Sequence, residues 1–230
     1  MSDLKLGIQM WSIHDICVQE GMASAIKKVK EMGYNGFEYA LGDSITLKER
    51  CNTDAEEAVK ILREYDVKAL GAHIPFEPML LDPKPVLEEC LKLEIPYAAV
   101  GPVFWGDRAT YAEQKETYDR LKEIAILFHK NGIQLQVHCS AFGYLKDYKG
   151  RYVVEGMLEE AGLENLQQEF DTAWMICGGV DPVEMLKKYE GHVDILHFKD
   201  FHPLQEEYSY LMVRHNPICE QQHDGCAVGE

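Results

Sequence analysis

The feature that most constrains this chain is a regular alternation of short apolar segments with longer segments whose apolar residues recur at helical spacing. The short segments are typical of strands and the longer ones of helices. The predicted strands are residues 6–12, 36–40, 67–74, 97–101, 133–138, 166–171 and 192–200; the predicted helices are 22–33, 55–66, 85–95, 111–132, 156–161 and 182–191. This alternation predicts parallel strands joined by helical crossovers.

Two architectures fit such a pattern, an open doubly wound sheet and a barrel. An open sheet that binds nucleotides should carry a glycine-rich turn after its first strand. The segment in that place, SIHDICVQEG at residues 12–21, has no such motif. The sequence therefore favours an α/β fold of the (β/α)8 TIM-barrel type, with about seven strands and the eighth βα unit missing at the C-terminus. The barrel is expected over residues 1–202, and residues 203–230 are expected to form an irregular tail.

Composition narrows the class of partner. The net charge of -16, from 39 acidic and 23 basic residues, argues against nucleic acid or an anionic membrane, because phosphate contacts need a basic face. No apolar run approaches the roughly 20 residues of a membrane helix, and the N-terminus lacks the apolar core of a signal peptide. The 7 cysteines are odd in number and scattered, which favours reduced thiols. We therefore expect a cytoplasmic location.

Polar and aromatic residues recur where the predicted strands end, which in a barrel is where the chemistry takes place. They are Trp11, His14, Glu38, His73, Trp105, His138, Asp171, His197 and Lys199. Imidazole nitrogen and carboxylate oxygen are ligands for zinc, manganese and iron. A cation at the barrel mouth would polarise a sugar carbonyl or hydroxyl and stabilise an enediolate as the neighbouring proton is removed.

One stretch of the sequence resembles a known family. The run FDTAWMICGGVDPVEMLKKYEGHVDILHFKD, residues 170–200, contains Asp-x-x-Trp, Gly-x-Asp-Pro and His-x-Lys-Asp at the spacing of the sugar phosphate isomerase/epimerase family of xylose isomerase-like TIM barrels. The segments LGIQMWS, GFEYA and AHI agree in order and spacing, so the resemblance covers essentially residues 5–202.

The resemblance implies roles for individual residues. Asp171 and His197 are expected as metal ligands, and His138 takes the position where relatives place a glutamate or a histidine ligand. Lys199 is expected to meet substrate oxygens or phosphate. The sugar pocket is expected to be lined by Trp11, Glu38, His73 and Trp105, with Glu38 as the candidate general base. The expected cofactor is a divalent ion, Mn²⁺ first, with Zn²⁺ and Mg²⁺ as alternatives.

The sequence also departs from the family. Relatives with histidine on the fifth strand often continue as His-Asn-His and then Glu-Phe, whereas this chain reads HCSAFGY at residues 138–144. Relatives also have an eighth strand that usually ends in a metal-ligating acid. We expect either a fragment or a gap covered by the tail or by another chain, since exposed sheet edges favour pairing, including pairing between copies of this chain.

The tail offers a separate metal hypothesis. His215, Cys219, His223 and Cys226 follow one another at intervals of four, four and three residues, and four such ligands can close a tetrahedral zinc site. The spacing differs from that of known zinc fingers, and chance clustering is the alternative.

Three functions remain open on the sequence. The first is a metal-dependent sugar or sugar phosphate isomerase or epimerase that abstracts a proton next to a carbonyl. The second is a keto-sugar or keto-inositol dehydratase or hydratase that uses the same site. The third is a catalytically inactive barrel that acts as a binding or subunit protein. An endonuclease of the same barrel type is disfavoured by the acidic charge.

Overall fold

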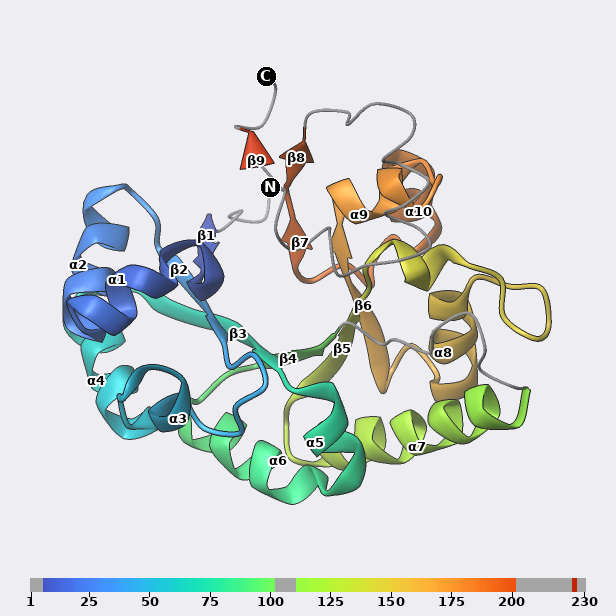
Figure 1. Cartoon of the computed structure of the whole chain (residues 1–230), viewed down its shortest axis with the longest axis horizontal. Helices are drawn as coiled ribbons and strands as arrows, with labels where there is room; N and C mark the ends of the chain where they lie inside the picture. The colour runs from blue at the N-terminus through green and yellow to red at the C-terminus, as the bar shows by residue number, and fades with distance from the viewer. Residues whose placement is uncertain (1–5, 102–110, 202–224, 227–230) are drawn as a thin grey trace. The chain divides into compact units, whose positions relative to one another are not determined.

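The computed structural model describes residues 6–101, 111–201 and 225–226 (Figure 1). The chain divides into two compact units. Unit 1 comprises Met1–Val100 and Leu127–Leu135, and unit 2 comprises Gly101–Ile126 and Gln136–Glu230. The division falls within one helix and one strand, so each unit contains part of both.

Seven strands follow one another in one sheet in chain order. They are β1 Gly7–Gln9, β2 Gly36–Ala40, β3 Lys68–Ile74, β4 Tyr97–Val100, β5 Gln134–His138, β6 Leu166–Asp171 and β7 Leu196–His197. The pairs β1–β2, β2–β3, β3–β4 and β6–β7 are parallel. Sequential parallel strands with helical crossovers define the (β/α) barrel type, and the described residues supply one strand fewer than its eight. The predicted fold class is therefore confirmed.

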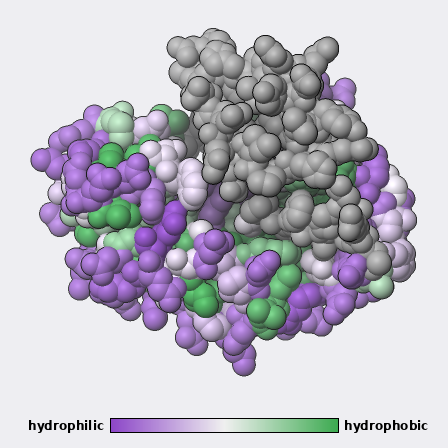
Figure 2. All heavy atoms as spheres, in the orientation of Figure 1, coloured by the Kyte–Doolittle hydropathy of each residue, from purple (hydrophilic) through white to green (hydrophobic). Residues whose placement is uncertain are grey.

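The helices of unit 1 are short and amphipathic. They are α1 His14–Gln19, α2 Met22–Glu31, α3 Leu47–Cys51, α4 Ala55–Glu64, α5 Phe76–Leu81 and α6 Pro83–Lys92, with the 3-10 helix η1 at Met10–Ile13. Apolar residues spaced three or four apart face the core, as Ala25, Ile26 and Val29 do in α2. The outer surface of these helices is mainly hydrophilic (Figure 2).

Unit 2 holds most of α7 Tyr111–Lys130, together with α8 Val153–Ala161, α9 Thr172–Cys177, α10 Pro182–Lys188 and the 3-10 helix η3 at Ala141–Tyr144. A buried ion pair stabilises the loop before α8. The Asp147 carboxylate accepts hydrogen bonds from Arg151 Nε at 3.0 Å and Nη2 at 2.8 Å. The Tyr118 hydroxyl of α7 donates to the Val153 carbonyl at 3.1 Å, which joins α7 to the start of α8.

The last strand is shorter than the sequence predicts. Instead of spanning 192–200, β7 pairs with β6 only through Phe170↔Leu196 and Asp171↔His197. The pairing ends there because β6 gives way to α9 at Thr172, and a helix offers no ladder partner. Beyond it, β8 Asp200–Phe201 pairs antiparallel with β9 Gly225–Cys226. The predicted boundary at residue 202 stays a prediction.

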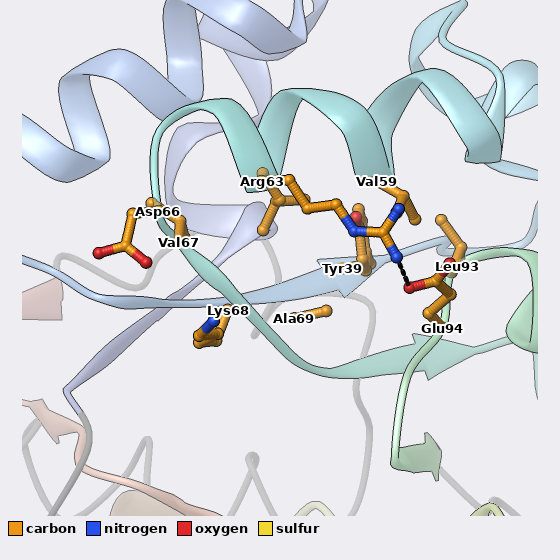
Figure 3. Close-up of a pocket in the computed structure, with 10 residues that line it drawn as sticks. Tyr39, Val59, Arg63, Asp66, Val67, Lys68, Ala69, Leu93 and Glu94 are labelled. Carbon is orange, nitrogen blue, oxygen red and sulfur yellow. Dashed lines mark hydrogen bonds and ion pairs between the residues drawn. The ribbon is translucent and has the colours of Figure 1, made fainter.

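Unit 1 has a pocket of about 310 Å³ at the start of β3 (Figure 3). The ion pair between Arg63 Nη2 and Glu94 Oε2, at 2.5 Å, lies beside it, and the buried Tyr39 ring lines it. Because Lys68 and Ala69 begin β3 whereas His73 stands near its end, this pocket is separate from the polar strand ends of unit 1. Within the described residues, no helix combines the length and the apolar character that a bilayer crossing requires.

Candidate metal centre

The ends of three strands in unit 2 carry histidines and carboxylates. His138 ends β5, Asp171 ends β6 and His197 ends β7. Glu169 stands two residues before Asp171, so strand alternation places both carboxylates on the same face of β6. The side chains of Glu169 and Asp171 are fully buried, and those of His138 and His197 are 10% exposed. Four ligand-type side chains are thus held together in the interior of unit 2.

The spacing of these groups is that of ligands around one cation. His138 Nε2 lies 3.4 Å from Asp171 Oδ2, His197 Nε2 lies 3.6 Å from Glu169 Oε1, and His197 Nδ1 lies 3.8 Å from Asp171 Oδ2. One ligand atom each from His138, Glu169 and His197 all lie within 4.8 Å of one another. Two ligands at 2.0–2.2 Å from a tetrahedral ion are about 3.4 Å apart. The donor set therefore fits a divalent metal.

Asp171 is tied to its surroundings through both oxygens. Its Oδ1 accepts the backbone N–H of Trp174 at 3.1 Å and so caps α9. Its Oδ2 lies 2.8 Å from the Lys199 ammonium. Burial opposes ionisation of this carboxyl, but the His138 hydrogen bond and the Lys199 charge outweigh it and hold the pKa of Asp171 well below its usual value. Asp171 is therefore an anion at neutral pH.

A second polar group lies in unit 1. The Glu38 carboxylate of β2 is 3.2 Å from His73 Nε2 of β3, and it accepts a hydrogen bond from Gln9 Nε2 of β1 at 3.4 Å. Glu38 is buried, with 4% of its surface exposed. A carboxylate beside an imidazole at this distance can pass a proton between the two groups.

Of the other residues that the sequence predicts for a site, some are described by the structure and others are not. Trp11 is 66% exposed in η1, with the Arg50 guanidinium 5.3 Å above its ring and the His14 ring stacked at 6.4 Å. Trp105 lies outside the described residues, as do three of the tail residues, His215, Cys219 and His223. Cys226 is described only as part of β9.

Sequence reasoning missed Glu169. The pattern of the segment LQQEFD predicts a polar strand and draws attention to its last residue, Asp171. The signal was the alternation itself, because residues 169 and 171 of one strand share a face. Cysteine contributes nothing to the cluster: burial raises the pKa of the neighbouring Cys139 thiol to about 12, so the thiol stays protonated. The five cysteines whose side chains are described are all free, as expected for reduced thiols.

Of the comparisons with known proteins, only the one with solved structures gives matches. No protein-family model matches the sequence, and no curated protein is significantly similar to it. Solved structures do match: a sugar phosphate isomerase/epimerase from Parabacteroides distasonis ATCC 8503 aligns with a TM-score of 0.71 at 16% identity, over 94% of this chain and 86% of that one. The chain has the fold of the xylose isomerase-like TIM barrels.

Two further solved structures align over most of the chain. The IolI protein, whose structure has a bound zinc atom, matches with a TM-score of 0.68 at 15% identity, over 87% of this chain and 74% of that one. The probable 3-DHS dehydratase AsbF from Bacillus anthracis matches with a TM-score of 0.69 at 14% identity, over 90% of this chain and 77% of that one. At these identities the similarity establishes the fold, as the sequence resemblance predicted.

Proposed function

We propose that the protein is a metal-dependent isomerase or epimerase of a sugar or sugar phosphate, acting by proton abstraction next to a carbonyl. The observation that carries the proposal is the convergence of His138, Glu169 and His197, with ligand atoms within 4.8 Å of one another. Asp171 stands 3.4 Å from one imidazole and 3.8 Å from the other. The names of two matched proteins, a sugar phosphate isomerase/epimerase and a zinc-containing IolI, support it.

In this proposal His138, Asp171 and His197 hold the cation, and Glu169 adds a second carboxylate. Mn²⁺ is the expected ion, with Zn²⁺ and Mg²⁺ as alternatives. Such an ion, when bound, supplies a Lewis acid for a substrate carbonyl or hydroxyl. Lys199, already 2.8 Å from Asp171, would hold the substrate oxyanion or a phosphate through its ammonium.

The proton transfer is assigned to Glu38. A buried carboxylate is a competent base for a carbon-bound proton, and His73 at 3.2 Å can share that proton once it has been taken. Trp11 and Trp105 are proposed to line the sugar site, since an aromatic face packs well against the apolar face of a sugar ring. Trp11 is exposed enough to do so.

A dehydratase acting on a keto-sugar or keto-inositol is the second candidate. The similarity to the probable 3-DHS dehydratase AsbF favours it. Abstraction of the same proton leads to elimination when the next carbon carries a hydroxyl that can leave. Product analysis separates the two: an isomerase or epimerase returns a product of the same mass, whereas a dehydratase removes one water.

The test combines metal content with proton exchange. We expect purified protein to bind about one equivalent of Mn²⁺ or Zn²⁺, and His197→Ala to lose it. The matched control is His129→Ala, since His129 is exposed at the end of α7. In D₂O, a panel of keto-sugars should reveal one that gains deuterium beside its carbonyl. Retention of metal by His197→Ala refutes the site, and protein without metal or exchange indicates an inactive barrel with a binding role.

Three expectations from the sequence remain proposals of this kind. The partner is a small sugar-like molecule, with no nucleic acid or membrane involved. The location is the cytoplasm, with which the free cysteines agree. Association between copies of the chain is the third expectation, and sedimentation of the purified protein measures it.

A further inference from the structure

Strand β7 of unit 2 ends abruptly at the candidate metal centre. Strand β7 has only two residues, and its ladder with β6 ends at the pair Asp171↔His197. Helix α9 begins at Thr172, so the backbone of β6 turns away immediately after that pair. Lys199 nevertheless places its ammonium 2.8 Å from Asp171 Oδ2. Something other than the ladder must hold the chain after His197.

The side chain of Thr172 meets this need. Its Oγ1 accepts the backbone N–H of Lys199 at 3.0 Å and donates to the carbonyl of the same residue at 2.8 Å. The carbonyl of His197 lies farther from the same oxygen, at 3.4 Å. A hydroxyl can donate one hydrogen bond and accept others, so one Thr side chain satisfies both backbone groups of Lys199. It replaces the missing backbone partner of the next ladder position.

We propose that Thr172 is a positioning residue of the candidate metal centre, whose hydroxyl fixes His197 and Lys199 against Asp171. The start of α9 then anchors both sides of the centre. Asp171 is held by the Trp174 N–H at 3.1 Å, and the end of β7 is held by the neighbouring residue, Thr172. The effect on metal binding rests on the proposed function, whereas the bonds to Lys199 do not depend on it.

The chemistry of the side chain makes the proposal specific. Valine has the shape and the β-branch of threonine but no hydroxyl, so Thr172→Val removes the two hydrogen bonds while filling the same space. Serine keeps the hydroxyl and loses only a methyl group. In the valine variant the backbone of Lys199 must bond to water instead, and the segment after β7 loses its attachment to the start of α9.

The experiment compares Thr172→Val and Thr172→Ser with the parent protein in two measurements. The first is amide hydrogen exchange of Lys199 in metal-free protein, followed by NMR. We expect exchange at least tenfold faster in Thr172→Val and within about twofold of the parent in Thr172→Ser. The second is calorimetric titration with Zn²⁺ alone, where we expect about tenfold weaker binding for valine and near-parent binding for serine, the range typical of groups that orient metal ligands.

A matched Thr→Val change separates positioning from general destabilisation. Thr46 caps α3 in unit 1 by accepting the Glu49 N–H at 3.2 Å, so Thr46→Val should lower stability without changing Zn²⁺ affinity. Unchanged exchange at Lys199 in Thr172→Val, or a serine variant that behaves like valine, overturns the proposal. So does fast exchange with unaltered Zn²⁺ binding. If the parent binds no Zn²⁺ while the exchange pattern holds, the attachment of β7 stands and the proposed metal function falls.

Discussion

Each of the two units holds a carboxylate close to a histidine, but the contacts around the carboxylates differ between the units. In unit 1, Glu38 stands 3.2 Å from His73, a hydrogen-bonding distance, and Gln9 adds a further donor. In unit 2, the two buried carboxylates lie 3.4–3.8 Å from the two imidazoles. The contacts in unit 2 are only slightly longer, but there two carboxylates meet two imidazoles, a donor set that can bind a divalent ion.

The two groups also differ in the number of charged side chains. With neutral imidazoles, the carboxylates of Glu169 and Asp171 and the ammonium of Lys199 leave the unit 2 cluster with one net negative charge in a buried setting. Low-dielectric surroundings make such a charge costly unless a cation compensates it. The pair in unit 1 has a single carboxylate beside one imidazole. We therefore expect a bound cation to compensate the charge of the unit 2 cluster.

The largest effect is expected from Glu38→Gln. Removal of a general base lowers turnover by roughly 10²–10⁴-fold, because the amide cannot take the substrate proton. Zn²⁺ affinity should fall much less than turnover, because Glu38 is not among the ligands proposed for the ion. Deuterium exchange with the active keto-sugar and calorimetric titration measure the two quantities. A parallel loss of Zn²⁺ binding would show that Glu38 acts on the ion and is not only the base.

A smaller but still large effect is expected from Glu169→Gln. Losing one carboxylate ligand should weaken Zn²⁺ binding about a hundredfold, at the upper end of the effects seen around metal sites. The amide fills the same volume, so the fold should persist. Glu164→Gln is the matched control, because Glu164 is exposed just before β6. If Glu169→Gln binds Zn²⁺ as tightly as the control does, Asp171 is the sole carboxylate ligand.

The sequence predicted where the strands lie better than it predicted where the last strand of the sheet, β7, begins and ends. Strands β2 and β6 begin and end where the pattern places them, since glycine, polar residues or helix starts bound them. Strand β7 is much shorter than predicted, because its length depends on where β6 becomes a helix, which is a tertiary constraint. Helices α1, α3, α5 and α9 have only five or six residues, too few for a periodic signal.

Most, but not all, residues of the candidate site could likewise be predicted from the sequence. His138, Asp171 and His197 stand out because each ends an apolar run, and the structure brings all three together in unit 2. Glu169 lies inside its strand, where position alone gives no signal and only the alternation of side chains does. The short distance between Lys199 and Asp171 depends on the Thr172 hydrogen bonds, and no pattern in the sequence encodes them.

A more modest effect, of opposite sign, is expected from Lys199→Met. The Lys199 ammonium lies 2.8 Å from Asp171 Oδ2, so a cation that approaches this oxygen meets a like charge. Removing the ammonium should therefore tighten Zn²⁺ binding, by about five- to tenfold once the partial exposure of Lys199 is allowed for. Turnover should fall at the same time. Weaker Zn²⁺ binding in this variant would mean that Lys199 supports the ion rather than competing with it.

The smallest predicted effect concerns the hydrogen bonding of a buried amide in the interior of unit 2. Gln136, fully buried, shares the face of β5 with His138, and both its amide atoms lack a hydrogen-bond partner among the described residues. Gln168 on β6 is also buried, but there only Oε1 lacks a partner among the described residues, because Nε2 donates to the Tyr144 hydroxyl at 2.8 Å. An unsatisfied buried amide costs about 1–3 kcal/mol, so Gln136→Leu should raise the unfolding free energy of metal-free protein by about 1 kcal/mol.

Gln168→Leu should have the opposite sign, because it leaves the Tyr144 hydroxyl without its donor. We expect a loss of about 1 kcal/mol, so the two variants should differ by about 2 kcal/mol in urea denaturation. Equal destabilisation by both changes would mean that the Gln136 amide is satisfied in solution, by water or by part of the chain outside the described residues. The metal measurements alone would then distinguish the unit 2 cluster from the Glu38–His73 pair.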